Sequence, residues 1–253
     1  MRYRARCEYD GTDFAGFQLQ PNGRTVQGEL ETALTRLGRG ERVVVDGAGR
    51  TDAGVHATGQ VIAFTWTGEM QDRALEQAVN ALLPRDVAIS DLRRTFLRFH
   101  PRYAARYREY RYTVWNGPRS PLHERVSLEL RAPLDIAAMA DAGTAFLGRL
   151  DVRAFGGETN RSTVRNVQMV RVRKVGCLVT IDVRANAFLR GQVRRMVAAL
   201  IEAGRGRIDK AAIEAALAAP GPAFNGAAAP ARGLCLRRVV MGRRPLDDKE
   251  DEE

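Results

Sequence analysis

The sequence RYRARCEY at residues 2–9 has the strict alternation of a half-buried β-strand. Its tyrosines and apolar residues share one face, whereas its arginines and Glu8 share the other. A turn follows at residues 9–12, and a helical pattern of apolar residues then runs from about Thr25 to Gly38, a residue type common just after a helix. This strand and helix open the series of elements that decides the fold.

The next elements continue the series. Short apolar runs predict strands at residues 43–45 and 60–67 and a further strand from Val87, and helical spacing predicts a helix capped by Asp72 and ended by Pro84. The resulting order over about a hundred residues, β-α-β-β-α-β, is that of the split-βαβ or ferredoxin-like arrangement. Such a sheet has one open face, and an open face bordered by arginines suits RNA.

The second half repeats this pattern more loosely. We expect strands at 110–114, 125–130, 167–175, 178–184 and 234–241, and helices at 134–147, 188–203 and 209–218. The predicted fold class is therefore α+β, with two ferredoxin-like (RRM-like) α/β sandwich domains built on antiparallel sheets. The domains are predicted at residues 1–104 and 105–245, followed by an acidic tail at 246–253 that we expect to be disordered.

The chain is strongly basic, with 40 Lys and Arg against 30 Asp and Glu and a formal net charge of +10. Lysine occurs only at positions 174, 210 and 249, so arginine supplies most of the positive charge. A GC-rich genome explains the ratio of arginine to lysine equally well, but it explains the net charge less well. The charge predicts a polyanionic partner, with nucleic acid favoured, because the guanidinium group contacts phosphate in a bidentate manner and stacks on bases.

Other sequence features narrow the class of protein. The chain has no apolar run of about 18 residues and no signal-peptide pattern, so we expect a soluble cytoplasmic protein. Cys7, Cys177 and Cys235 are scattered without a Cys-x-x-Cys motif, and the histidines lack metal-ligand spacing. We therefore predict no disulfide framework, no metal and no cofactor.

The loop GAGRTDAGVH at residues 47–56 places Arg50 and Asp52 among glycines, between two predicted strands. A phosphate-binding loop is excluded, because the glycine spacing is wrong, Gly-Lys-Ser/Thr is absent and a strand follows. A structural turn and a catalytic carboxylate, kept ionised by Arg50 and a second cation, both stay open. Taken alone, the loop favours the structural turn.

Two other segments favour the catalytic interpretation of the Asp52 loop over the structural turn. Tyr110 and Tyr112 share one face of a predicted strand, with Arg111 on the other face. We interpret Tyr112 as a core residue, whereas Tyr110, at the start of that strand, is better placed to meet a base. Arg194 lies beside the apolar stripe of the predicted helix at 188–203, where a partly buried cation needs an anionic partner.

The segment AGRTDAGVHA at residues 48–57 resembles the signature of the tRNA pseudouridine synthase A family. Further motifs resemble that family in the same order along nearly the whole chain: YDGT at 9–12 with Gly16 and Gln18, RTVQ at 24–27, Asn80 with residues 83–84, Phe99-His100, Arg108 with Tyr110 and Tyr112, NAFLR at 186–190 with Val193-Arg194, and APA at 229–231. Phe14 and Phe17 stand where the family often has Tyr and Trp, so aromatic packing should survive.

This resemblance implies the pseudouridine synthase fold. It also implies isomerisation of uridine to pseudouridine at positions 38, 39 and 40 in the anticodon arm of tRNA, without cofactor or metal. It implies that Asp52 is the essential carboxylate and that Arg50 and Arg194 keep it ionised and oriented. It also implies that Tyr110 packs on the target base and that the protein is a homodimer whose two subunits both contact the tRNA.

Two other classes of function compete with this interpretation. A non-catalytic RNA-binding protein with two RRM-like domains explains the charge and the order of elements, but not the Asp52 loop, and the aromatic RNP1 pattern is missing. A glycosidase acting on free nucleosides would call for a second catalytic carboxylate and for much less positive charge.

Overall fold

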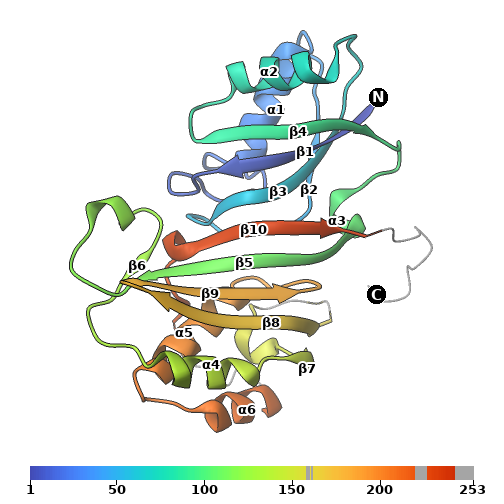
Figure 1. Ribbon diagram of the computed structural model, residues 1–253. Coiled ribbons are helices and arrows are strands. Elements are labelled where there is room, and N and C mark those ends of the chain that lie inside the picture. The colour runs from blue at the N-terminus through green and yellow to red at the C-terminus, as the bar shows by residue number, and fades with distance from the viewer. Residues whose placement is uncertain (158–159, 161, 220–226, 243–253) are drawn as a thin grey trace. The chain divides into compact units, whose positions relative to one another are not determined.

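The computed structural model describes residues 1–157, 160, 162–219 and 227–242. The chain has a mixed α/β fold and divides into two compact units (Figure 1). Unit 1 consists of Met1–Arg106 with the last strand from Leu236 onward, and unit 2 consists of the described residues between Tyr107 and Cys235. The acidic tail predicted at 246–253 lies outside the described residues.

The last strand does not follow the domain division expected at residues 104 and 105. The chain passes from unit 1 to unit 2 after Arg106, but β10 (Leu234–Met241) belongs to unit 1 from Leu236 onward. There it lies beside β3 in the strand order. Sheet pairing joins segments that are far apart along the chain, so sequence order alone does not assign a terminal strand to a unit.

Unit 1 confirms the predicted order β-α-β-β-α-β. Its other elements are β1 (Arg2–Tyr9), α1 (Val26–Leu37), β2 (Val45–Gly47), β3 (His56–Thr65), α2 (Asp72–Leu82), β4 (Val87–Thr95) and the short α3 (Pro101–Ala104). The strand order is β4-β1-β3-β10, with β2 beside β3, and β1 is antiparallel to both of its neighbours. The two longer helices pack against each other, and α2 packs beside β4.

Local sequence explains the limits of α1. The Thr25 side chain accepts a hydrogen bond from the Gly28 N–H at 3.2 Å, which satisfies a donor that the first helical turn leaves unpaired. At the other end, the Gly38 N–H donates to the Leu34 carbonyl at 2.9 Å. Both predicted ends of this helix are confirmed.

Three other predicted limits in unit 1 need correction. Asp72 is the first residue of α2, and Gln71 holds the capping position. The strand expected at 43–45 lies at Val45–Gly47, and the strand expected at 60–67 already begins at His56. The pairing of β2 and β3 sets these limits, since Val45 faces Phe64 and Gly47 faces Ile62 in the antiparallel register.

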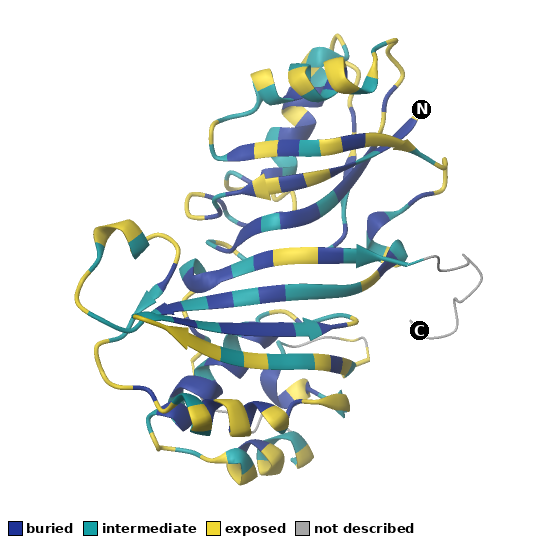
Figure 2. Cartoon of the chain, in the orientation of Figure 1, coloured by how far each residue is buried: buried dark blue, intermediate teal, exposed yellow. Residues whose placement is uncertain are grey.

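Unit 2 has the strand order β5-β9-β8-β7, with the short β6 parallel to β5. Its elements are β5 (Ala105–Trp115, whose first two residues belong to unit 1), η1 (Pro121–His123), β6 (Leu128–Glu129), α4 (Ile136–Thr144), β7 (Gly148–Asp151), η2 (Arg153–Phe155), β8 (Val164–Val175), β9 (Leu178–Ala185), α5 (Gln192–Gly204), α6 (Lys210–Ala218) and η3 (Ala231–Gly233). Figure 2 shows that β9 is largely buried, whereas β8 beside it is mostly exposed or half-buried. Helix α4 packs on β8 and on α5.

Two corrections in unit 2 concern elements that carry predicted site residues. Strand β5 begins at Ala105 rather than at 110, so Tyr110 lies in the middle of the strand and not at its start. Helix α5 begins at Gln192 rather than at 188, because Gly191 precedes it with a φ of +69° that no residue within an α-helix adopts.

The remaining differences are in shorter elements. The strand expected at 125–130 is reduced to Leu128–Glu129, and the helix expected at 134–147 spans Ile136–Thr144, capped by Asp135. Strand β7 was not predicted, because four residues are too few to show a clear alternation. No helix in the described part of the chain is long and apolar enough to cross a membrane.

Candidate active site

Asp52 lies in the loop that joins β2 to β3 in unit 1. The Asp52 side chain is half-buried, and the neighbouring Thr51 is buried with 6% of its surface exposed. Arg50 is exposed and forms no ion pair with another described residue. The Asp52 carbonyl accepts a hydrogen bond from the Val55 N–H at 3.2 Å, so the chain turns sharply just after the candidate carboxylate.

The segment from Tyr9 to Phe17 holds one end of this loop through Thr51. The Tyr9 and Thr51 hydroxyl groups share a buried hydrogen bond of 2.8 Å. The Phe17 N–H donates to the Thr51 carbonyl at 3.1 Å. The residue directly before Asp52 is therefore held by both its side chain and its main chain.

Two glycines allow the two segments to approach this closely. Gly16 has a φ of +111°, and a Cβ at this position would lie 2.7 Å from the Thr51 carbonyl oxygen. A Cβ on Gly11 would overlap the carbonyl group of Val55. A larger residue at either position would push the Asp52 loop away from the segment that supports it.

The other end of the loop is held through His56. Its Nδ1 accepts a hydrogen bond from the Gly11 N–H at 3.0 Å and lies 3.1 Å from Asp10 Oδ1. The imidazole thus has a fixed orientation at the point where β3 begins.

An arginine anchors the supporting segment to the rest of unit 1. Arg24 stacks on the Phe14 ring at 4.1 Å from its centroid and forms two hydrogen bonds to the Asp86 carboxylate, of 2.6 and 2.9 Å. It also contacts Glu29 at 2.6 Å. The expectation that aromatic packing survives at Phe14 and Phe17 is confirmed, since both are 3% exposed.

In unit 2, Tyr110 is 7% exposed and lies edge-to-face with Phe188, with their ring centroids 5.3 Å apart. Phe188 belongs to the segment just before α5. This contact connects β5 to the segment that leads into the Arg194 helix.

Arg194 and Tyr112 contact one short segment of unit 2. Arg194 Nε donates to the Ala229 carbonyl at 2.7 Å, and the Ala229 N–H donates to the Arg194 carbonyl at 3.1 Å. The Tyr112 hydroxyl donates to the Pro230 carbonyl at 2.9 Å. Burial raises the pKa of Tyr112 above its usual range, and the positive charge of Arg194 opposes that rise. Tyr112 is fully buried, so its interpretation as a core residue is confirmed.

The predicted site residues thus fall into two groups, with Arg50 and Asp52 in unit 1 and Tyr110 and Arg194 in unit 2. Sequence reasoning did not identify Tyr9 and Thr51 as residues that hold the Asp52 loop. The alternation of residues 2–9 indicates that Tyr9 is buried, but nothing in the sequence indicates which group its hydroxyl meets.

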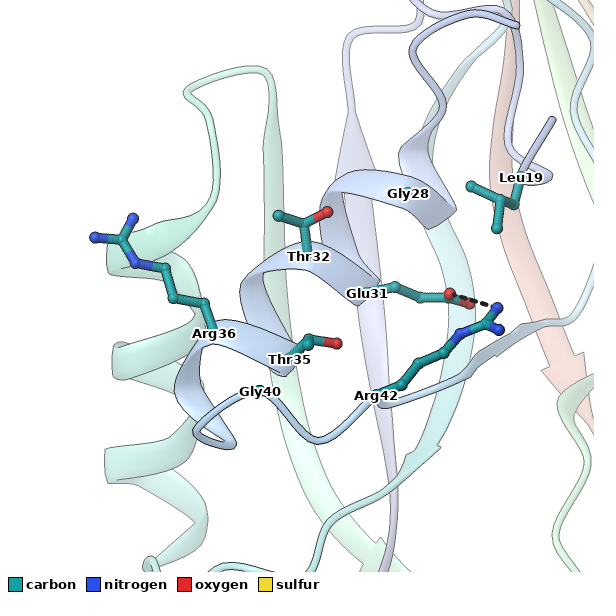
Figure 3. Close-up of a pocket in the computed structure, with 8 residues that line it drawn as sticks. All are labelled: Leu19, Gly28, Glu31, Thr32, Thr35, Arg36, Gly40 and Arg42. Carbon is teal, nitrogen blue, oxygen red and sulfur yellow. Dashed lines mark ion pairs between the residues drawn. The ribbon is translucent and has the colours of Figure 1, made fainter. Parts of the chain in front are cut away.

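A shallow pocket of about 520 Å³ lies elsewhere in unit 1, against α1 and the residues that follow it (Figure 3). Arg42 and Glu31 line it and form an ion pair of 3.6 Å. None of the four predicted site residues lines this pocket. Among the described residues, no group of three or more His, Cys, Asp or Glu side chains could hold a metal ion.

The chain belongs to the tRNA pseudouridine synthase family, whose model matches residues 5–104 and 142–240. Two similar proteins are named tRNA pseudouridine synthase A. That of Geobacter sulfurreducens is 42% identical over 235 residues, covering 92% of this chain and 96% of its own. That of Moorella thermoacetica is 45% identical over 237 residues, covering 91% of this chain and 96% of its own. A chain of a solved Cbf5-Nop10-Gar1 complex overlaps 77% of this chain and 44% of its own length at 15% identity, with a TM-score of 0.29 that is too low to inform the fold.

Proposed function

We propose that this protein isomerises uridine to pseudouridine at positions 38, 39 and 40 in the anticodon arm of tRNA. The observation that carries the proposal is the family match at residues 5–104 and 142–240, which includes the loop that holds Asp52. The reaction breaks the bond between C1′ and N1, turns the uracil and rejoins it to the ribose through C5. The C5 proton leaves at the end and the freed N1 takes up a proton, so atoms balance without water, oxidant or phosphate donor.

Asp52 is the essential carboxylate in this proposal, either adding to the substrate or removing a sugar proton. Its half-buried position after a firmly held Thr51 supports this role, because a reacting group must be held in a productive direction. A paired base is out of reach of any such group, so the target nucleotide must be flipped out of the stack.

Three further residues have proposed roles around Asp52. Arg50 and Arg194 keep the carboxylate ionised and oriented, since nearby positive charge favours the ionised form. Tyr110 packs on the target base and helps to take up the C5 proton.

The same proposal covers where the protein acts, its oligomeric state and its domains. The protein acts in the cytoplasm, without metal or cofactor, as a homodimer whose two subunits both contact the tRNA. The two units of the chain are both ferredoxin-like in this proposal, and the first, which includes β10 from Leu236 onward, carries the Asp52 loop. Light scattering on the purified protein measures the oligomeric state directly, and a monomer at working concentration would contradict the homodimer.

The test of Asp52 is the release of tritium from tRNA that carries 5-tritiated uridine. Asp52→Asn and Asp52→Ala should abolish release while leaving tRNA binding largely intact. Asp141→Asn is a matched control, because Asp141 is an exposed carboxylate on α4 in unit 2. Appreciable release by either Asp52 variant would refute the catalytic assignment.

Substrate comparison separates the competing functions. A non-catalytic RNA-binding protein would bind tRNA and release no tritium even as the wild type. A nucleosidase would act on free uridine and liberate uracil, whereas the proposed enzyme acts on intact tRNA and liberates no base.

A further inference from the structure

We propose that Tyr9 and Thr51 form a positioning pair that fixes the direction of the Asp52 carboxylate. This inference rests on the proposed catalytic role of Asp52. Neither residue touches the reacting atoms in this proposal. The pair acts through the main chain of the Asp52 loop.

The hydrogen bond between the two hydroxyl groups is buried. It measures 2.8 Å, and Tyr9 and Thr51 are 3% and 6% exposed. A hydroxyl group in such a place is costly unless it is paired, so each hydroxyl constrains the side-chain rotamer of the other. The Thr51 side chain is thereby fixed to β1, which is itself held between two neighbouring strands.

The main chain on both sides of Asp52 is held as well. The Thr51 carbonyl accepts from the Phe17 N–H at 3.1 Å, and the Asp52 carbonyl accepts from the Val55 N–H at 3.2 Å. The Gly54 N–H in turn donates to the Phe14 carbonyl at 3.3 Å. These contacts hold the main chain on both sides of Asp52, so they set the point and the direction in which its side chain leaves the backbone.

Stability alone does not call for hydroxyl groups at these two positions. Two apolar side chains of the same shape could fill the same volume, and replacing both partners of a buried hydrogen bond is often close to neutral for stability. A hydrogen bond differs from an apolar contact in being directional. Direction is what a carboxylate needs when it must meet one atom of a flipped nucleotide.

The experiment is a double-mutant cycle with Tyr9→Phe and Thr51→Val, which remove the hydroxyls and keep the shapes. Each variant should lower kcat for tritium release by about 10- to 100-fold, because misplacement of a reacting group on the ångström scale has effects of this size. The double variant should be no slower than the slower single variant, and its melting temperature should be close to that of the wild type. The KM for tRNA should stay within about twofold, since no binding group has been removed.

Two control variants make the result specific. Thr51→Ser keeps the hydroxyl and should restore most of the kcat lost in Thr51→Val. Tyr3→Phe removes a hydroxyl from the same buried face of the same strand, where Tyr3 stacks on Phe64 at the end away from the loop. It should leave kcat unchanged.

Three outcomes would overturn the proposal. The first is a kcat for Tyr9→Phe equal to that of Tyr3→Phe, and the second is a Thr51→Ser variant as slow as Thr51→Val. The third is a double variant whose loss of kcat is matched by a loss of tRNA binding. Asp52→Ala is measured alongside. If it stays active, the proposed function of Asp52 fails. If it is inactive while the double variant is fully active, the positioning pair alone fails.

Discussion

Tyr110 and Tyr112 lie two residues apart on the same face of β5, yet their surroundings differ. Tyr112 is fully buried and its hydroxyl donates to Pro230, whereas Tyr110 is 7% exposed and packs edge-to-face on Phe188. Arg111, on the opposite face, pairs at 2.7 and 3.0 Å with the buried Asp182, which lies opposite it on β9. The alternation read from the sequence therefore describes this strand correctly at each of the three positions.

We expect Tyr110→Phe to slow tritium release by about 100-fold, because it keeps the ring and removes a hydroxyl proposed to take part in proton transfer. The measurement is single-turnover release at saturating enzyme. Tyr112→Phe is the matched control on the same strand, and it should cost about 1 kcal/mol of folding stability with little effect on release. An unchanged rate in Tyr110→Phe would reduce Tyr110 to a platform for the base.

At the scale of elements, Arg24 connects three parts of unit 1. Its guanidinium group joins the Phe14 ring in the supporting segment, Glu29 in the first turn of α1 and Asp86 just before β4. The hydrogen bonds from Arg24 hold the pKa of Asp86 below its usual value, against an opposing effect of partial burial. The Asp86 carboxylate therefore contributes to stability in its ionised form.

We expect Asp86→Asn to lower the free energy of unfolding by about 1–2 kcal/mol at neutral pH, a modest figure because both side chains are partly exposed. The pKa of Asp86 is lower in the folded state, so this contribution is complete above the unfolded-state pKa of about 4 and is lost as the pH falls through the folded-state value. The free energies of unfolding of the wild type and the variant, measured with urea, should therefore become equal at acidic pH.

Glu214→Gln provides the control for this measurement. Glu214 pairs with Lys210 one turn away on α6 at 3.7 Å, and both side chains are well exposed. Its loss should change stability by less than about 0.5 kcal/mol. A constant difference between Asp86→Asn and the wild type from neutral pH into acid would contradict the linkage.

At the scale of the whole molecule, the net charge of +10 predicts how tRNA binding depends on salt. Each arginine–phosphate contact releases counterions, so the dissociation constant should rise by at least about tenfold between about 50 and 200 mM salt. A filter-binding or fluorescence titration at several salt concentrations measures the slope. Asp52→Asn should show the same slope as the wild type, because Asp52 belongs to the chemical step.

A flat salt dependence would mean that apolar or base contacts dominate binding. That result would contradict the inference that the positive charge of the chain binds the tRNA phosphates. It would not test the role of Asp52. The two proposals are therefore tested separately.

The sequence by itself determined the features that depend on neighbouring residues. The alternation of residues 2–9, the Thr25 and Gly38 ends of α1 and the position of the Asp52 loop between two strands all follow from local spacing and capping chemistry. The predicted ends of helices and strands were wrong where the local sequence pattern was weak or misleading. Phe188 and Leu189 continue the apolar pattern of α5, but the left-handed backbone of Gly191 starts that helix later.

Only the tertiary structure decided how the candidate site is held. The hydroxyls of Tyr9 and Thr51 meet across 42 positions of sequence, and Arg24 reaches Asp86 across 62. The return of β10 to unit 1 spans a still longer distance along the chain. Each of these contacts depends on how strands pair and pack, and the partner of a polar side chain is set by that packing and not by its neighbours in sequence.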